Sequence, residues 1–144
     1  LESVLSSSRN MKNKNFVILA KIDHILFKSD ALSHVEHAEH KEFSDHHNCR
    51  FGKWYESEGG TQFQHSSSFK AIETPHKIVH DSVLKSFEIL KHRSILDSRD
   101  EIHTFFMKME ESSDRLFELM DNMLEEEAHY KDEQVSEGDV ELWA

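Results

Sequence analysis

The sequence predicts an all-α protein, an antiparallel four-helix bundle with three long helices and one short helix. Only 4 Gly and 1 Pro occur among its 144 residues, so the chain is poor in the residues that make tight turns between short strands. Apolar residues recur at steps of three and four over long stretches, which is the period of a helix with one buried face. A chain of this length suits one domain with its own core.

The first long helix is expected over residues 15–40, after a Ser-rich segment at 1–12 that we interpret as a linker or a frayed helix start. Its predicted buried side is made of residues three and four apart: Phe16, Leu19, Asp23, Leu26 and Phe27. Residues 43–55 are predicted to form the short helix, closed by a turn at Gly59-Gly60. Residues 61–73 are expected to be irregular or to form a short helical piece, with Ser66-Ser67-Ser68 at its middle.

Thr74 and Pro75 are a suitable start for the next long helix, with Thr as the cap and Pro in the first turn, where its missing N–H does no harm. This helix is expected to end near Leu96. Its apolar face contains the following residues: His76, Val79, His80, Val83, Leu84, Phe87 and Leu90.

The last long helix is predicted over residues 101–127. Its residues alternate steps of four and three, as in the seam of a bundle: Ile102, Phe106, Met109, Ser113, Leu116, Met120 and Met123. The acidic segment 129–144 has no helical period and is expected to be a disordered tail. The bundle domain itself is therefore predicted over residues 13–128.

Composition excludes several classes of partner. The chain has 17 Lys and Arg against 28 Asp and Glu, a formal net charge of −11, which disfavours nucleic acid and anionic membrane surfaces. No run of about 18 apolar residues is present, so no membrane span is expected. A single cysteine cannot form an internal disulfide, which favours a reducing, cytoplasmic location. Because the chain starts with Leu1 and no Met, we interpret it as part of a longer protein.

Cys49 lies in the segment Asp45–Tyr55, together with two histidines and one of the two tryptophans. A lone thiol beside imidazoles has four possible roles: a small buried hydrophobe, a catalytic nucleophile, a redox sensor or a metal ligand. The positions of the other histidines bear on the choice among them.

His76 and His80 are four residues apart, which places both imidazoles on one helix face at about 6 Å, a spacing suited to chelating one metal ion. His24 likewise lies among apolar residues of the first helix. With Cys49, these three histidines would complete a tetrahedral Zn²⁺ site. The alternative is that the histidine pair arises by chance in a chain with 12 histidines.

Three segments resemble the chemoreceptor zinc-binding domain, a bacterial family found at the end of cytosolic chemoreceptors and attached to some diguanylate cyclases. They are Lys21-Ile22-Asp23-His24, the motif His46-x-x-Cys49-Arg50-Phe51-Gly52-Lys53-Trp54-Tyr55, and Pro75-His76-x-x-x-His80. The resemblance implies that Zn²⁺ is held by His24, Cys49, His76 and His80, in a helical bundle that pairs as a homodimer.

Two further residues are candidates for support of the site. His46 would hydrogen-bond the thiolate or a ligand, although a capping or surface role fits it nearly as well. Asp23 would accept the free N–H of a ligating histidine, although it could equally be a surface carboxylate.

Four protein ligands leave no open position for water, which argues against an enzyme. Zinc would hold Cys49 as a thiolate, the form that oxidants attack. The resemblance implies a sensory domain that responds to zinc or hypochlorous acid and acts, through an upstream chemoreceptor signalling domain, on the chemotaxis kinase complex. Two alternatives are a zinc-responsive regulatory module of a diguanylate cyclase and a structural, zinc-stabilised dimerisation bundle.

Overall fold

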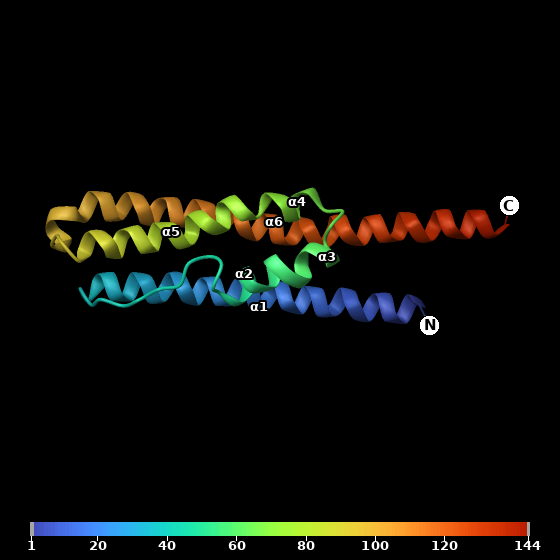
Figure 1. The fold of residues 1–144 in the computed structure, drawn as a ribbon, viewed down its shortest axis with the longest axis horizontal. Helices are drawn as coiled ribbons and strands as arrows, with labels where there is room; N and C mark the ends of the chain where they lie inside the picture. The colour runs from blue at the N-terminus through green and yellow to red at the C-terminus, as the bar shows by residue number, and fades with distance from the viewer. Residues whose placement is uncertain (1, 144) are drawn as a thin grey trace.

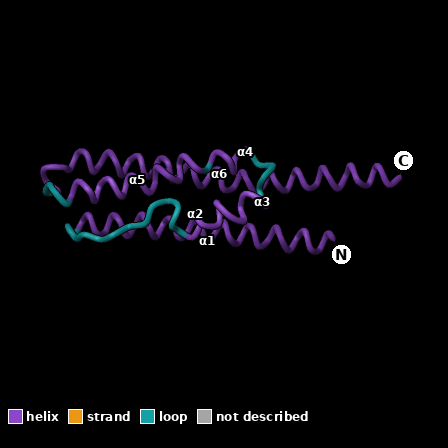
Figure 2. The backbone as a smooth tube through the Cα atoms, in the orientation of Figure 1, coloured by secondary structure: helices purple, strands orange, loops and turns teal. Residues whose placement is uncertain are grey.

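Three long helices dominate the computed structural model, which describes the backbone of residues 2–143 and the side chains of residues 4, 5 and 7–134 (Figure 1). They are α1 (Glu2–Glu36), α5 (Glu73–Leu90) and α6 (Ile95–Trp143). Short helical segments join α1 to α5: α2 (Arg50–Trp54), the π-helix η1 (Tyr55–Gly59), α3 (Gly60–Gln62) and α4 (Ser67–Ala71). Within the described backbone there is no strand (Figure 2), which confirms the predicted all-α class.

The three long helices lie along one common direction (Figure 1). The pair α5 and α6 pack against each other, and α1 also contacts α6. Helix α2 packs on α1 through Phe51 and Trp54, whose rings meet Phe16. The two ends of the chain lie at the same end of the molecule (Figure 1). None of the described helices is sufficiently long and apolar to pass through a membrane.

The core is divided into two clusters along the bundle. One contains Val17, Ala20, Phe51, Phe63, Phe69, Ile72, Leu116, Leu119, Met120 and Met123. The other contains Ala31, Val35, Val79, Val83, Phe87, Ile102 and Met109. Along α1, His24 falls between the members of the two sets, and along α5 His76 and His80 flank Val79 of the second set. Polar side chains are therefore buried next to the apolar core.

The buried face of α1 differs from the predicted one. Leu19 and Leu26 are 37% and 61% exposed, whereas Val17, Ala20 and His24 are buried. The helix carries apolar residues on more than one side, so the period alone does not select the side that packs. It also starts earlier than predicted, and it ends at Glu36, just before Ala38, whose left-handed φ of 53° leads the chain away.

The predicted short helix over residues 43–55 begins only at Arg50. The Asp45 carboxylate accepts the backbone N–H groups of His47 and Asn48, both at 3.0 Å, and so closes a turn instead. Gly59 and Gly60 both have right-handed helical φ and ψ, so the chain continues from η1 into α3 without the predicted turn.

Of the two alternatives for residues 61–73, the structure shows the short helical piece, α4, which leads directly into α5. Ser66 caps α4 by accepting the Phe69 N–H at 3.0 Å. Glu126 of α6 then accepts the Ser66 hydroxyl and the Ser68 N–H, each at 3.0 Å, which ties this corner to the long helix. Thr74 is therefore inside the helix and not its cap, while Pro75 lies in the first turn as predicted.

Helix α6 is longer than predicted at both ends. It starts at Ile95, and its backbone stays helical through residues 129–143, where we expected a disordered tail. Glu133 pairs with His129 one turn earlier, at 3.1 Å, which suits a helix. The predicted seam is otherwise confirmed, since all of its members are buried except the half-buried Phe106. The proposed division into a linker, a bundle domain and a tail remains a prediction.

Candidate metal centre

Four side chains that are distant in sequence converge between α1, α2 and α5. They are His24 on α1, Cys49 at the start of α2, and His76 and His80 on α5. Their potential ligand atoms all lie within 4.8 Å of one another. The three imidazoles are at most 2% exposed, and Cys49 is half-buried. The structure therefore brings together all four side chains that the sequence pointed to.

Two of the imidazoles are oriented by backbone carbonyls. The Nδ1 atom of His24 lies 2.7 Å from the Ala20 carbonyl oxygen, and that of His80 lies 2.8 Å from the Ser44 carbonyl oxygen. Because a carbonyl only accepts, Nδ1 carries the proton in both rings and Nε2 presents a lone pair. Both Nε2 atoms are buried, and neither has a hydrogen-bond partner among the described side chains and backbone. A buried acceptor without a donor is costly, and a metal ion would satisfy both.

Burial also keeps the imidazoles uncharged. It lowers the pKa of His76 to about 2, with the charges of His24 and His80 acting in the same direction, and it lowers the pKa of His80 to about 4. The pKa of His24 is lowered as well, again mainly by burial. All three rings are therefore neutral at pH 7, which is the state that binds metal.

The sulfur of Cys49 is held at the start of α2. It lies 3.3 Å from Nε2 of His76, and it accepts the backbone N–H of Gly52 at 3.3 Å as the cap of the helix. Burial raises the pKa of the Cys49 thiol when no metal is bound, although the hydrogen bond from Gly52 opposes this. A bound divalent ion would reverse the balance and hold the sulfur as a thiolate.

The donor set fits a tetrahedral zinc site. Zn–N and Zn–S bonds of about 2.0–2.3 Å place tetrahedral ligand atoms about 3.3–3.8 Å apart. The separation of 3.3 Å between the Cys49 sulfur and His76 Nε2 is already in this range. Small side-chain movements would bring the remaining donors to the same spacing. Three imidazole nitrogens and one thiolate would leave no position open for water.

Residues 24–85 match the family described as the chemoreceptor zinc-binding domain, and all four converging side chains lie in this range. This segment is similar to the chemoreceptor zinc-binding domain. The resemblance seen in the sequence is thereby confirmed. Comparison with curated proteins and with solved structures finds no match.

The two residues expected to support the site of this zinc-binding domain are placed differently from the expectation. Asp23 lies 3.4 Å from Arg50 Nε, and within the described part of the chain no hydrogen bond joins it to a histidine. The His46 imidazole hydrogen-bonds Glu73 at 2.8 Å, and only the His46 carbonyl faces the Cys49 thiol, at 3.8 Å.

The groups that orient the converging side chains were not predicted from the sequence. They are the carbonyls of Ala20 and Ser44 and the N–H of Gly52. Backbone groups have no side-chain signature, so only the path of the chain reveals them. The one indication in the sequence was Gly52, three residues after Cys49. A glycine has no side chain, so another part of the backbone can approach it closely.

Proposed function

We propose that this chemoreceptor zinc-binding domain holds one Zn²⁺ on His24, Cys49, His76 and His80, and that it regulates a bacterial chemoreceptor. The metal-bound thiolate of Cys49 is its redox switch, and oxidant or a change in zinc is its stimulus. One observation carries the proposal: a buried cluster of four donors contains two imidazole Nε2 atoms with no hydrogen-bond partner among the described residues, and a single sulfur at its edge.

A closed site of four protein ligands supports binding and sensing over catalysis. Catalytic zinc sites keep one position for water or substrate, and this donor set would fill all four. The domain therefore acts without chemistry on a substrate. Its location is the cytoplasm, where a lone thiol stays reduced until an oxidant reaches it.

Cys49 is suited to react because it is the least enclosed of the four donors. Hypochlorous acid attacks a thiolate to give a sulfenic acid and chloride, so the sulfur is oxidised by two electrons. The neutral sulfenic acid is a weaker ligand than the thiolate, and zinc binding weakens. The site then loses the contact between α2 and the histidines of α1 and α5.

The segment that starts at Cys49 can carry this change to the rest of the bundle. Trp54 packs on Phe16 of α1 with ring centroids 4.6 Å apart. Tyr55 stacks on Phe69 at 4.3 Å and donates its hydroxyl to the Phe69 carbonyl at 2.7 Å. Release of the cysteine would loosen these contacts with α1 and α4. The change then passes to the upstream chemoreceptor signalling domain and the chemotaxis kinase complex.

Titration of the zinc-loaded protein with hypochlorous acid tests the switch. We expect about one zinc per chain to be released as Cys49 is oxidised, together with faster hydrogen exchange over residues 43–58, because α2 is anchored through the sulfur. A coloured chelator measures the zinc, and mass spectrometry measures both oxidation and exchange. If oxidation of Cys49 left zinc bound and hydrogen exchange unchanged, the zinc would have only a structural role.

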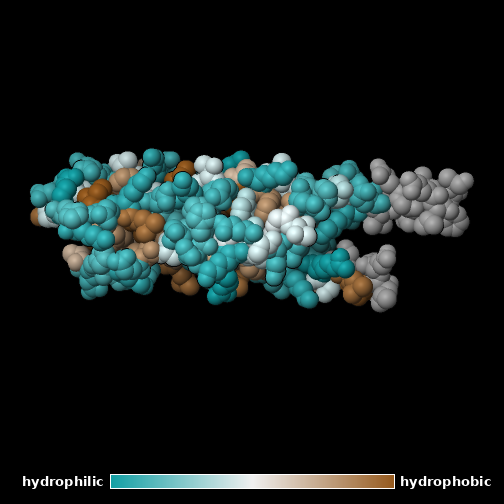
Figure 3. Space-filling model, viewed as in Figure 1, coloured by the Kyte–Doolittle hydropathy of each residue, from teal (hydrophilic) through white to brown (hydrophobic). Residues whose placement is uncertain are grey.

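An exposed apolar stripe on α1 supports the homodimer. Its members are separated by seven residues each and are 47–67% exposed: Val4, Met11, Ile18, Ile25 and Leu32. Ile22, 47% exposed, lies between two of them. Figure 3 shows hydrophobic side chains along the edge of the molecule that α1 forms. A repeat of seven over 29 residues is typical of a seam between helices, and a second copy of α1 would cover it.

Charging this stripe is expected to separate the proposed dimer. The double change Ile18→Glu and Ile25→Glu places carboxylates in the seam, where pairing would bury them without partners. Analytical ultracentrifugation should show a monomer, with the helical content of the wild type, because both side chains point away from the core. A double change of Arg99 and Arg115 to Glu, both exposed on α6, should leave the dimer intact. A wild-type protein that is already monomeric would contradict the proposal.

A further inference from the structure

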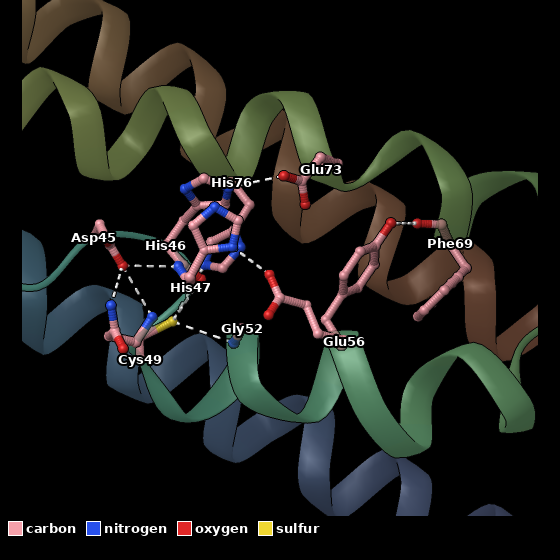
Figure 4. A network of polar contacts seen from close by, with 11 residues as sticks. Asp45, His46, His47, Cys49, Gly52, Glu56, Phe69, Glu73 and His76 are labelled. Atoms are coloured by element: carbon pink, nitrogen blue, oxygen red, sulfur yellow. Dashed lines mark hydrogen bonds and ion pairs between the residues drawn. The ribbon is translucent and has the colours of Figure 1, made fainter.

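A second polar cluster lies beside the four-donor site (Figure 4). Its centre is the histidine pair of the turn before α2. The His46 and His47 rings lie 3.9 Å apart between centroids. His46 Nε2 is 2.8 Å from Glu73 Oε1 on α5, and His47 Nδ1 contacts the Glu56 carboxylate on η1. Three segments of the chain therefore direct two imidazoles and two carboxylates to one place.

The donors of this cluster are close enough to share an ion. One ligand atom from each of His46, His47 and Glu73 lies within 4.8 Å of the other two. His46 is only 5% exposed, and its Nδ1 has no hydrogen-bond partner among the side chains and backbone that the structure describes. Such an orphaned buried nitrogen indicates that the network is incomplete as it stands.

The charge of the cluster also favours a cation. Glu56 and Glu73 are about half-exposed carboxylates, and their only ion-pair partners among the described side chains are the two histidines. No lysine or arginine of the described chain neutralises them. A divalent cation would compensate the charge of both carboxylates.

We propose that His46, His47 and Glu73 form a second divalent metal site, distinct from the four-donor site and open to solvent. Two imidazoles and one carboxylate select borderline ions such as Zn²⁺, Co²⁺ or Ni²⁺ over Mg²⁺ and Ca²⁺, which prefer oxygen donors. Glu56 accepts Nδ1–H of His47, which leaves Nε2 of that ring for the ion and fixes the ring orientation.

The position of the cluster determines how this site behaves. Three protein ligands leave at least one position for water, and His47 and Glu73 are 53% and 45% exposed. The ion is therefore held more weakly and exchanges faster than an ion enclosed by three buried histidines and Cys49. The site does not require the first one to be filled, because the two ligand sets share no residue.

Both sites nevertheless use the same two segments of the chain. His46 and Cys49 belong to one turn, and Glu73 and His76 lie one helical turn apart on α5. The His46 and His76 rings meet edge to face at 5.5 Å. An ion on the outer site would therefore restrain the turn that carries Cys49.

Equilibrium dialysis of the untagged, metal-stripped protein against Zn²⁺ tests the proposal. We expect about two zinc ions per chain, one tight and one weaker, because two separate donor sets are present. His47→Gln should weaken the second ion by about tenfold or more and leave the first unchanged. Cys49→Ala should weaken binding of the first ion and leave the second unchanged. The two variants therefore distinguish loss of one site from loss of the other. With Co²⁺ as the probe, only the tight ion should show the absorption of a thiolate ligand.

The matched control is His37→Gln, an exposed histidine directly after α1 whose ring bonds the Ser33 carbonyl of that helix. It should leave both ions in place. A wild-type protein that saturates at one ion per chain would overturn the proposal. So would a second ion that His37→Gln weakens as much as His47→Gln does, since that ion would then be adventitious.

Discussion

Replacing His80 with alanine is expected to remove tight zinc binding and the stability that depends on it. His80 offers a buried Nε2 without a partner in the described part of the chain, and the cluster around it there contains only three other donors, His24, Cys49 and His76. At free zinc about 1,000 times the wild-type Kd, bound metal contributes about 4 kcal/mol to the free energy of unfolding. Elemental analysis should find about one zinc per chain in the wild type at the tight site and little in the variant.

Urea unfolding with and without a chelator separates the metal effect from a packing effect. The wild type should lose several kcal/mol when stripped of zinc, whereas His80→Ala should unfold at the same urea concentration in both conditions. His92→Ala is the matched control, because His92 follows α5 but is exposed. A His80→Ala variant that keeps its zinc and its response to the chelator would remove residue 80 from the proposed ligands.

Gly52→Ala is expected to disrupt both the fold and the metal site. A Cβ at position 52 would lie 1.8 Å from the His46 carbonyl oxygen, far inside van der Waals contact. The obstacle is backbone, so the turn carrying Cys49 would have to move away from α2. Overpacking of this kind costs about 3 kcal/mol or more. The Gly52 N–H that bonds the sulfur would shift too, so zinc affinity should fall along with stability.

Gly60→Ala provides the control at a second helical glycine. A Cβ there meets nothing within 4 Å, and the backbone is already helical. This substitution should stabilise the protein slightly, by about 0.5–1 kcal/mol, because it removes freedom from the unfolded chain. Zinc titration and urea unfolding of both variants give the comparison. Equal effects of the two substitutions would mean that the close approach at Gly52 is not what holds the turn in place.

The four converging side chains could be predicted from the sequence because their chemistry is carried by residue type and local spacing. His76 and His80 share a helix face whatever the rest of the chain does, and both are buried on it. Cys49 is the one thiol available, and the motif around it is specific. The long amphipathic pattern of α6 likewise predicted its buried seam.

The face of α1 could not be predicted in the same way. Leu19 and Leu26 fit the helical period as well as Val17 and Ala20 do, yet the small side chain of Ala20 is buried and both leucines are exposed. A helix with apolar residues on two sides can pack against the core with either side. Which side meets the core depends on the shape of its neighbours, and the other side is left for a partner.

By itself, then, the sequence determined the all-α class, the four converging donors and the family, because periodicity and ligand type are local properties. Tertiary structure alone decided that Cys49 caps a helix whose start is set by the Asp45 turn. It also decided that carbonyls of Ala20 and Ser44 orient two imidazoles, and that His46 and His47 meet two carboxylates from distant segments. These contacts depend on where the backbone passes in space, which no pattern of side chains along the chain records.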